Sequence, residues 1–118
     1  MQYEYFYGAQ AEQFSFYRIP KALFTEPNFR ELSTDAKVLY GILLDRMSLS
    51  LKNQRLDAQN KVYIIFTVEE IMDALNCANQ KATRLMVELE KQAGLIERKR
   101  QGLGRPNLIY VKNFAATI

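Results

Sequence analysis

The sequence predicts an α+β fold that is mainly α-helical, and two observations carry that prediction. The first is a pair of short helical patterns joined by a tight turn within residues 66–94, as in a helix-turn-helix. The second is a pair of strand-like runs at 95–100 and 107–112, joined by the glycine-rich segment 101–106. A helix-turn-helix followed directly by a two-stranded hairpin with a cationic tip indicates a winged helix-turn-helix with a small antiparallel sheet.

The composition sets the broad class of the protein. The chain has 118 residues, 48% of them hydrophobic, which is enough for one domain with a real core. Its apolar runs are too short to span a bilayer, and its start is aromatic and acidic, so we predict no membrane partner and no signal peptide. The single cysteine, Cys77, excludes an internal disulfide and fits a cytoplasmic protein.

Residues 1–18 are predicted to form an N-terminal aromatic arm ahead of the winged-helix domain at 19–114. A tail at 115–118 is expected to begin a linker to a C-terminal domain that is absent here. The arm is an extended segment or loose hairpin that either folds back on its own core or packs on a second subunit, because exposed aromatic surface needs a cover. It holds half of the aromatic residues, namely Tyr3, Tyr5, Phe6, Tyr7, Phe14, Phe16 and Tyr17.

Two helices and a strand are predicted before the helix-turn-helix. Pro20 stands at the first position of a short helix at 19–24. Ser33 or Thr34 then caps a long helix to about Leu51, which we expect to be the central buried helix. Its apolar stripe comprises Ala36, Leu39, Tyr40, Leu43, Leu44 and Met47. A β-branched and aromatic run at residues 62–66 follows and is predicted to be a strand that pairs with the wing.

Local signals define both helices of the helix-turn-helix. Thr67 is a good N-cap, and Glu70 three residues later completes a capping box. Asn76 tolerates the left-handed conformation that ends the first helix. The second helix, predicted at 79–93 and ended by Gly94, turns its apolar residues inward. Its outer face carries Asn79, Gln80, Lys81, Thr83, Arg84 and Lys91.

The positive charge is concentrated on the second helix and the hairpin. Residues 79–112 hold eight Lys and Arg against three acidic residues, whereas residues 1–78 hold eight against ten. A basic surface of this kind is the electrostatic footprint of a protein that binds nucleic acid. We therefore predict that the outer face of the second helix is a recognition helix that lies in the major groove of double-stranded DNA.

Side-chain chemistry assigns roles on this helix. Arg84 could bridge guanine O6 and N7, and Asn79 or Gln80 could pair with adenine. Lys81 and Lys91 are predicted to contact phosphates, which position the protein without specifying sequence. The free backbone amides at Thr67 could hold a further phosphate, although two glutamates follow and oppose it.

The predicted wing supplies the second set of contacts. Arg105 at the tip is the candidate for minor-groove insertion. Lys99 and Arg100 are predicted to hold phosphate, and strand alternation places Arg98 and Arg100 on the opposite face from Lys99. Asn107 completes the predicted DNA-binding wing. The alternative is a hairpin that only covers the core, with its cations as a solvated face.

Catalysis is not predicted, so we expect no enzyme, no cofactor and no metal. The chain has no histidine, and one cysteine cannot make a thiolate zinc site. The Gly102-Leu103-Gly104 segment precedes a strand rather than a helix, so it is a turn and not a phosphate-binding loop.

Three stretches, at residues 16–24, 32–40 and 94–114, resemble the N-terminal domain of the RepA-type plasmid replication initiators of Gram-positive bacteria. The resemblance covers nearly the whole chain from Phe14 to Phe114, and the Gly-Leu-Gly-Arg-Pro-Asn segment at 102–107 is its most specific part. The fold is also similar to that of primosomal DnaD-like proteins.

The resemblance implies a domain that binds repeated sites (iterons) in a plasmid origin, as a homodimer. It also implies that a separate C-terminal domain engages host replication proteins. The alternatives are a winged-helix transcriptional regulator, a DnaD-like replisome-loading protein, and a protein-interaction winged helix that has lost DNA binding.

Overall fold

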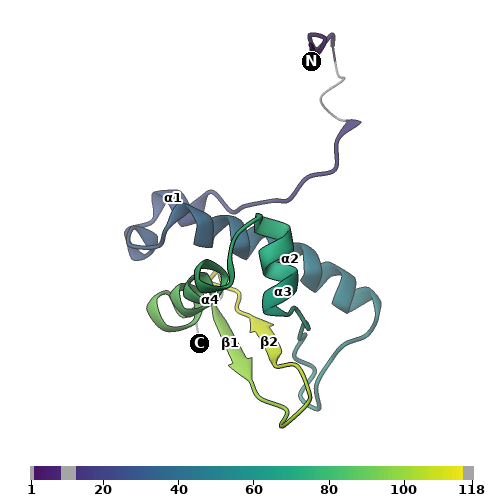
Figure 1. The fold of residues 1–118 in the computed structure, drawn as a ribbon, viewed down its shortest axis with the longest axis vertical. Coiled ribbons are helices and arrows are strands. Elements are labelled where there is room, and N and C mark those ends of the chain that lie inside the picture. Colours follow the sequence, from purple (N-terminus) through teal and green to yellow (C-terminus); the bar gives the residue numbers. More distant parts are fainter. Residues whose placement is uncertain (1, 9–12, 116–118) are drawn as a thin grey trace.

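The computed structural model describes residues 2–8 and 13–115 and has the predicted α+β architecture (Figure 1). The helices gather around a long central one, and a two-stranded hairpin follows them in the chain. The elements are α1 (Ala22–Thr25), the 3₁₀ turn η2 (Pro27–Phe29), α2 (Thr34–Lys52), α3 (Val68–Leu75), α4 (Asn79–Val87), the π-helix η3 (Glu88–Gln92), β1 (Ile96–Lys99) and β2 (Leu108–Val111). No helix among the described residues is both long and apolar enough to cross a membrane.

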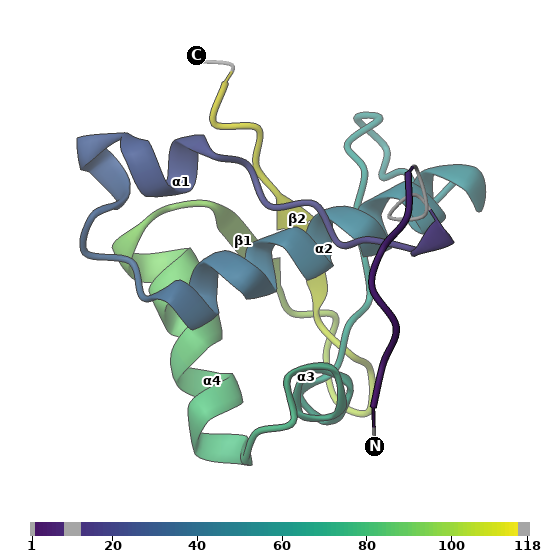
Figure 2. The same cartoon turned by 90° about the horizontal axis from the view of Figure 1, so that it is seen from above.

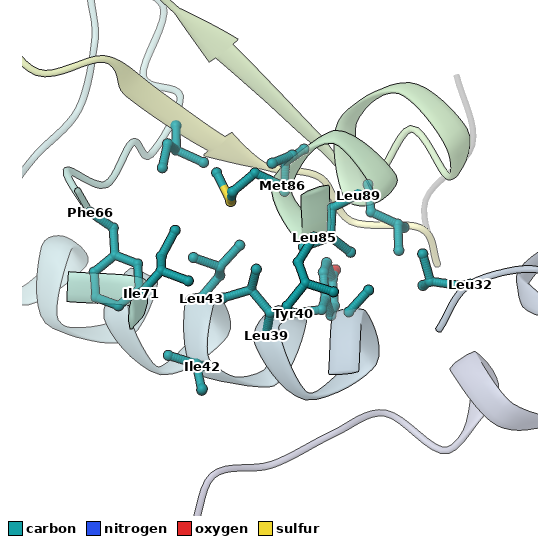
Figure 3. Close-up of a cluster of buried hydrophobic side chains, with 14 of the residues drawn as sticks. Leu32, Leu39, Tyr40, Ile42, Leu43, Phe66, Ile71, Leu85, Met86 and Leu89 are labelled. Carbon is teal, nitrogen blue, oxygen red and sulfur yellow. The ribbon is translucent and has the colours of Figure 1, made fainter. Parts of the chain in front are cut away.

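Helix α2 is the centre of the core, as predicted. Its N-cap is Ser33, whose hydroxyl accepts a hydrogen bond from the Ala36 amide at 3.2 Å. Leu39 and Leu43 are completely buried, and Figure 3 shows side chains of α2 directed toward those of α3 and α4. The labelled cluster is Leu32, Leu39, Tyr40, Ile42, Leu43, Phe66, Ile71, Leu85, Met86 and Leu89.

A residue from the end of the helix-turn-helix also caps α2. The Glu88 carboxylate accepts hydrogen bonds from the Ser33 amide and hydroxyl, both at 2.9 Å. A carboxylate at a helix N-terminus satisfies free amides and complements the helix dipole. This contact therefore fixes the start of α2 against the start of η3.

The helix-turn-helix has the caps that the sequence predicts. The Thr67 hydroxyl accepts from the Glu70 amide at 3.2 Å, and the Glu70 carboxylate accepts from the Thr67 amide at 3.1 Å. Asn76 leaves α3 in the left-handed conformation, with φ of 55°. The Arg46 guanidinium pairs with Glu70 and lies 4.8 Å from the Phe66 ring centroid, which ties α3 to α2.

The second helix differs from the continuous α-helix predicted at 79–93. It is α-helical only to Val87, and its last turn widens into η3, with the Ala93 amide donating to the Glu88 carbonyl at 2.9 Å. Within this turn Leu89 is buried, and Glu88 at its start accepts a hydrogen bond from the Ser33 amide. Such π-helical turns often occur at functional sites.

The short first helix and the run at 62–66 also depart from their predictions. Helix α1 begins at Ala22 with Lys21 as N-cap, so Pro20 precedes the helix instead of occupying its first position. In the 62–66 run, only Ile64 pairs with β2, through two hydrogen bonds to Ile109 of 2.8 and 2.9 Å. Just before it, Val62 bridges Leu56. Because the run changes partner within two residues, it does not form a regular strand.

The two wing strands pair antiparallel, with Ile96 opposite Val111 and Lys99 opposite Leu108. They are shorter than the predicted runs at 95–100 and 107–112. Ile96 and Ile109 are buried on the core side, so the hairpin is anchored by one apolar face. The loop between its strands projects beyond the body of the molecule (Figure 1).

The described part of the arm leaves its aromatic rings open to solvent. Residues 13–18 lie beside α2, where Gly41 permits the approach: a Cβ there would lie 2.9 Å from the Arg18 carbonyl oxygen. Residues 2–8 extend away from the helices (Figure 1), with Tyr5 82% and Phe6 62% exposed. Whether the arm covers its own core or packs on a second subunit therefore stays a prediction. The predicted arm and tail also include residues 1, 9–12 and 116–118, which lie outside the described residues.

Candidate nucleic-acid interface

The helix-turn-helix and the wing meet at one side of the molecule. Figure 2 shows α3, the first turn of α4 and the loop between β1 and β2 along the same edge. Helix α4 continues into η3, which contacts β1 through Glu90 and Arg98. This geometry allows the second helix and the wing loop to approach one ligand surface together.

The outer face of α4 is exposed, as its pattern predicts. Asn79, Gln80 and Thr83 are solvent-exposed, and the Thr83 hydroxyl donates to the Asn79 amide oxygen at 3.5 Å. The exposed Arg84 side chain makes no hydrogen bond or ion pair with any described residue. Lys91 is also exposed, in η3, and lines a shallow hollow with Arg84. These polar groups are available to a ligand.

Lys81 has a partner that the sequence did not reveal. Its Nζ lies 2.7 Å from an Asp35 carboxylate oxygen in the first turn of α2. Both side chains are about half exposed, so the ion pair is worth little in water. A phosphate contact by Lys81 would compete with Asp35.

Arg98 lies against the second helix. Its amide, Nε and Nη2 all donate to the Glu90 carboxylate, at 3.0, 3.0 and 2.8 Å. The Arg98 side chain is 25% exposed and that of Glu90 16%. The pair therefore joins the wing to η3, and the DNA contact predicted for Arg98 would have to compete with this ion pair.

The Glu90–Arg98 pair gives a pH-dependent prediction. Partial burial raises the pKa of Glu90, but the hydrogen bonds and charge of Arg98 outweigh it, so the pKa lies below its usual value. A lowered pKa means that the carboxylate stabilises the fold above about pH 4.3 and loses that contribution as pH falls through the folded value. We expect the free energy of unfolding of the wild type to exceed that of Glu90→Gln at pH 7, with the difference shrinking toward pH 3.

Chemical denaturation of both proteins across this pH range measures that difference. The matched control is Glu97→Gln in β1, the strand that holds Arg98, because Glu97 is 57% exposed and its ion pair with Lys112 is long, at 3.9 Å. Its removal should cost about 0–1 kcal/mol at pH 7. A Glu90→Gln protein as stable as the wild type at pH 7 would contradict the prediction.

The end of β1 and the loop that follows it carry the remaining predicted cations. Lys99, Arg100, Arg105 and Asn107 are exposed, and the three cationic side chains make no hydrogen bond or ion pair within the described chain. The Gln101 side-chain amide donates to the Pro106 carbonyl at 2.8 Å across the base of the loop. The exposed cations of the wing therefore lie on or beside a loop whose two ends are joined by a hydrogen bond.

The Thr67 amide, predicted to hold a phosphate, already has a hydrogen-bond partner within the protein. Its amide and hydroxyl both lie within hydrogen-bonding distance of the Glu70 carboxylate, at 3.1 and 3.3 Å. A phosphate at the start of α3 would have to displace that carboxylate. No group of three or more His, Cys, Asp or Glu among residues 2–8 and 13–115 is placed to hold a metal ion.

Residues 15–118 match the family model described as "Replication initiator protein A (RepA) N-terminus". The chain belongs to this RepA N-terminal family. A curated relative, a "41 kDa protein" of Lactobacillus helveticus, is 30% identical over 92 residues, which are 78% of this chain. The chain spans about a quarter (26%) of the length of that relative.

Solved structures agree with the RepA N-terminal assignment. One described as "N-Terminal domain of DNA binding protein" is 38% identical with a TM-score of 0.79, and one described as "Structure of Rep-DNA complex" is 37% identical with the same score. Both alignments cover 98% of this chain and 88% of the other. A third, "Structure of MDR initiator", is 39% identical over 97% of this chain and 89% of its own, with a TM-score of 0.76. The predicted family and winged-helix fold are thereby confirmed.

Proposed function

We propose that this chain is the DNA-binding domain of a plasmid replication initiator and recognises repeated sites in the replication origin. One observation carries the proposal. The start of α4 and the wing loop lie along one edge, and the cations Arg84, Arg100 and Arg105 of these elements are exposed without partners among the described residues. Polyanionic DNA is the ligand that such a surface selects. The similarity to a structure described as a Rep–DNA complex supports it.

The chemistry divides between the two elements. Arg84, Asn79 and Gln80 on α4 read base edges in the major groove, because their side chains match guanine or adenine. Lys99 and Arg100 hold phosphates, and Arg105 enters the minor groove. All of this is binding rather than catalysis, and a role at a plasmid origin belongs in the cytoplasm.

Two copies of the domain are expected to bind together. Tyr5 and Phe6 are largely exposed on a segment that extends away from the helices, and aromatic surface of this kind marks contact sites. The arm of one copy therefore packs on a second. The curated relative is about three times as long as this chain, since the matched residues are 78% of this chain and 26% of that relative. We propose that a C-terminal domain in a protein of that length engages host replication proteins.

The experiment is selection of bound duplexes from a random pool, with the mass of the complex measured on the selected site. The proposal expects one recurring sequence, matching repeats in the origin, and a mass of two protein copies per site. A single promoter operator in place of repeats would favour a transcriptional regulator. No salt-sensitive binding to any duplex would contradict DNA binding altogether.

Lys99→Ala tests the phosphate role of the wing. Removal of one phosphate contact should weaken binding to all duplexes alike and reduce the slope of log affinity against log salt by about one unit. Binding titrations at several salt concentrations measure the slope. The control is Lys52→Ala, an exposed cation at the end of α2, which should leave the slope unchanged. Equal slopes for the wild type and Lys99→Ala would remove Lys99 from the interface.

A further inference from the structure

The tip of the wing carries a large apolar side chain that the proposed phosphate contacts do not use. Leu103 is 103% exposed, more than any other large hydrophobic residue described. Single exposed leucines are common on protein surfaces and need no explanation by themselves. What distinguishes Leu103 is its place at the apex of a loop whose other exposed side chains include Arg100 and Arg105.

The loop is built to present this side chain. Gly102 and Gly104 flank it with φ of +112° and +77°, conformations that favour glycine. The Gln101 side chain closes the neck by donating to the Pro106 carbonyl at 2.8 Å, and the Arg105 amide donates to the Gly102 carbonyl at 3.3 Å. A Cβ placed on either glycine would meet nothing within 4 Å, so the apex stands in open space.

The surroundings of Leu103 select one class of ligand. Arginine side chains are drawn to the negative potential of a narrow minor groove. Proteins that bind this groove often insert an apolar wedge such as leucine between base pairs, which partly unstacks them and bends the duplex. A cationic loop with one apolar side chain at its apex has both parts of that arrangement.

We infer that Leu103 is a wedge that enters the minor groove beside Arg105, partly unstacks one base step and kinks the duplex. The inference rests on the proposed function, because the helix-turn-helix must first place the wing against DNA. An anionic lipid surface would also attract a leucine among arginines. Duplex DNA is favoured because α3 and the start of α4 lie along the same edge as the loop (Figure 2).

The test uses the selected duplex with 2-aminopurine at successive minor-groove steps beneath the wing and a fluorophore pair at its ends. The wild type should raise 2-aminopurine fluorescence at one step and shorten the end-to-end distance, as expected for a kink of about 20–90°. Leu103→Ala should lose both signals and bind several-fold more weakly. Leu103→Met should retain them, because methionine also serves as a wedge.

Two controls separate the wedge from folding and from DNA binding itself. Leu51→Ala removes another exposed leucine, at the end of α2, and should behave as the wild type. Fluorescence anisotropy of the same duplex reports binding independently of its shape. If Leu103→Ala binds with an unchanged bend and unchanged 2-aminopurine signal, the wedge is wrong while the proposed function stands.

The other outcomes are equally decisive. If the wild type binds no duplex in a salt-sensitive manner, the proposed function and the wedge fall together. If Leu103→Ala instead loses binding to phosphatidylserine vesicles but bends DNA as the wild type does, the apex is a lipid contact and the inference is overturned.

Discussion

Leu85→Ala is expected to lower the free energy of unfolding by about 2–5 kcal/mol, the usual cost of removing a buried leucine. Leu85 is completely buried in the middle of α4, beside Leu39 and Tyr40 of α2 (Figure 3). The loss combines the transfer free energy of the removed atoms with the cavity that they leave. A domain of this size is stable by only about 5–15 kcal/mol, so the change takes a large share of the total.

Urea denaturation of the wild type and Leu85→Ala measures this cost. Val87→Ala is the matched control, because Val87 is in the same helix but 41% exposed, and its truncation should cost much less. DNA affinity of the folded fraction should change little, since Leu85 faces away from the outer surface of α4. Equal destabilisation by the two variants would mean that α4 is not packed as the structure has it.

Arg84→Ala is expected to weaken binding to the selected duplex by about 1–3 kcal/mol and to relax sequence preference at one base pair. Arg84 is exposed and unpaired within the described chain, so the wild type gives up no internal contact when it binds. A bidentate arginine–guanine contact is lost outright in the variant, and alanine cannot replace it. Binding to scrambled duplexes should change much less.

Each protein is titrated against the selected duplex and a scrambled duplex at fixed salt. The ratio of the two affinities shows whether Arg84 contributes to sequence preference. Arg55→Ala removes an exposed cation from the loop between α2 and α3 and serves as the control for general charge. If Arg84→Ala weakens both duplexes by the same factor, Arg84 is a phosphate contact and not a base reader. An unchanged ratio and unchanged affinity would place the recognition surface elsewhere.

Much of the fold followed from signals that are local in the chain. Thr67 and Glu70 are one helical turn apart, so their capping box is set by short-range geometry alone. The apolar stripe of α2 likewise defined the central helix before any tertiary contact was known. The family followed from the chain itself, through stretches such as the wing segment at 102–107.

The ion-pair partners could not be predicted in this way. Lys81 and Asp35 are far apart in sequence, and no pattern links them until α4 packs beside α2. The sequence predicts Arg98 as a free cation of the wing. Its pairing with Glu90 depends on the turn between η3 and β1, and the sequence does not specify the geometry of that turn. The predicted cationic surface therefore overstated the charge free to meet a ligand.

The sequence by itself determined the order of the elements, their caps and the concentration of positive charge after residue 78, because these depend on neighbours within a turn or a strand. Only the tertiary structure decided which cations remain free, where the 62–66 run loses its pairing and which residues from distant segments contact the end of the second helix. Those features depend on contacts between distant segments, such as Glu88 with Ser33, whose energies exist only once the core has packed.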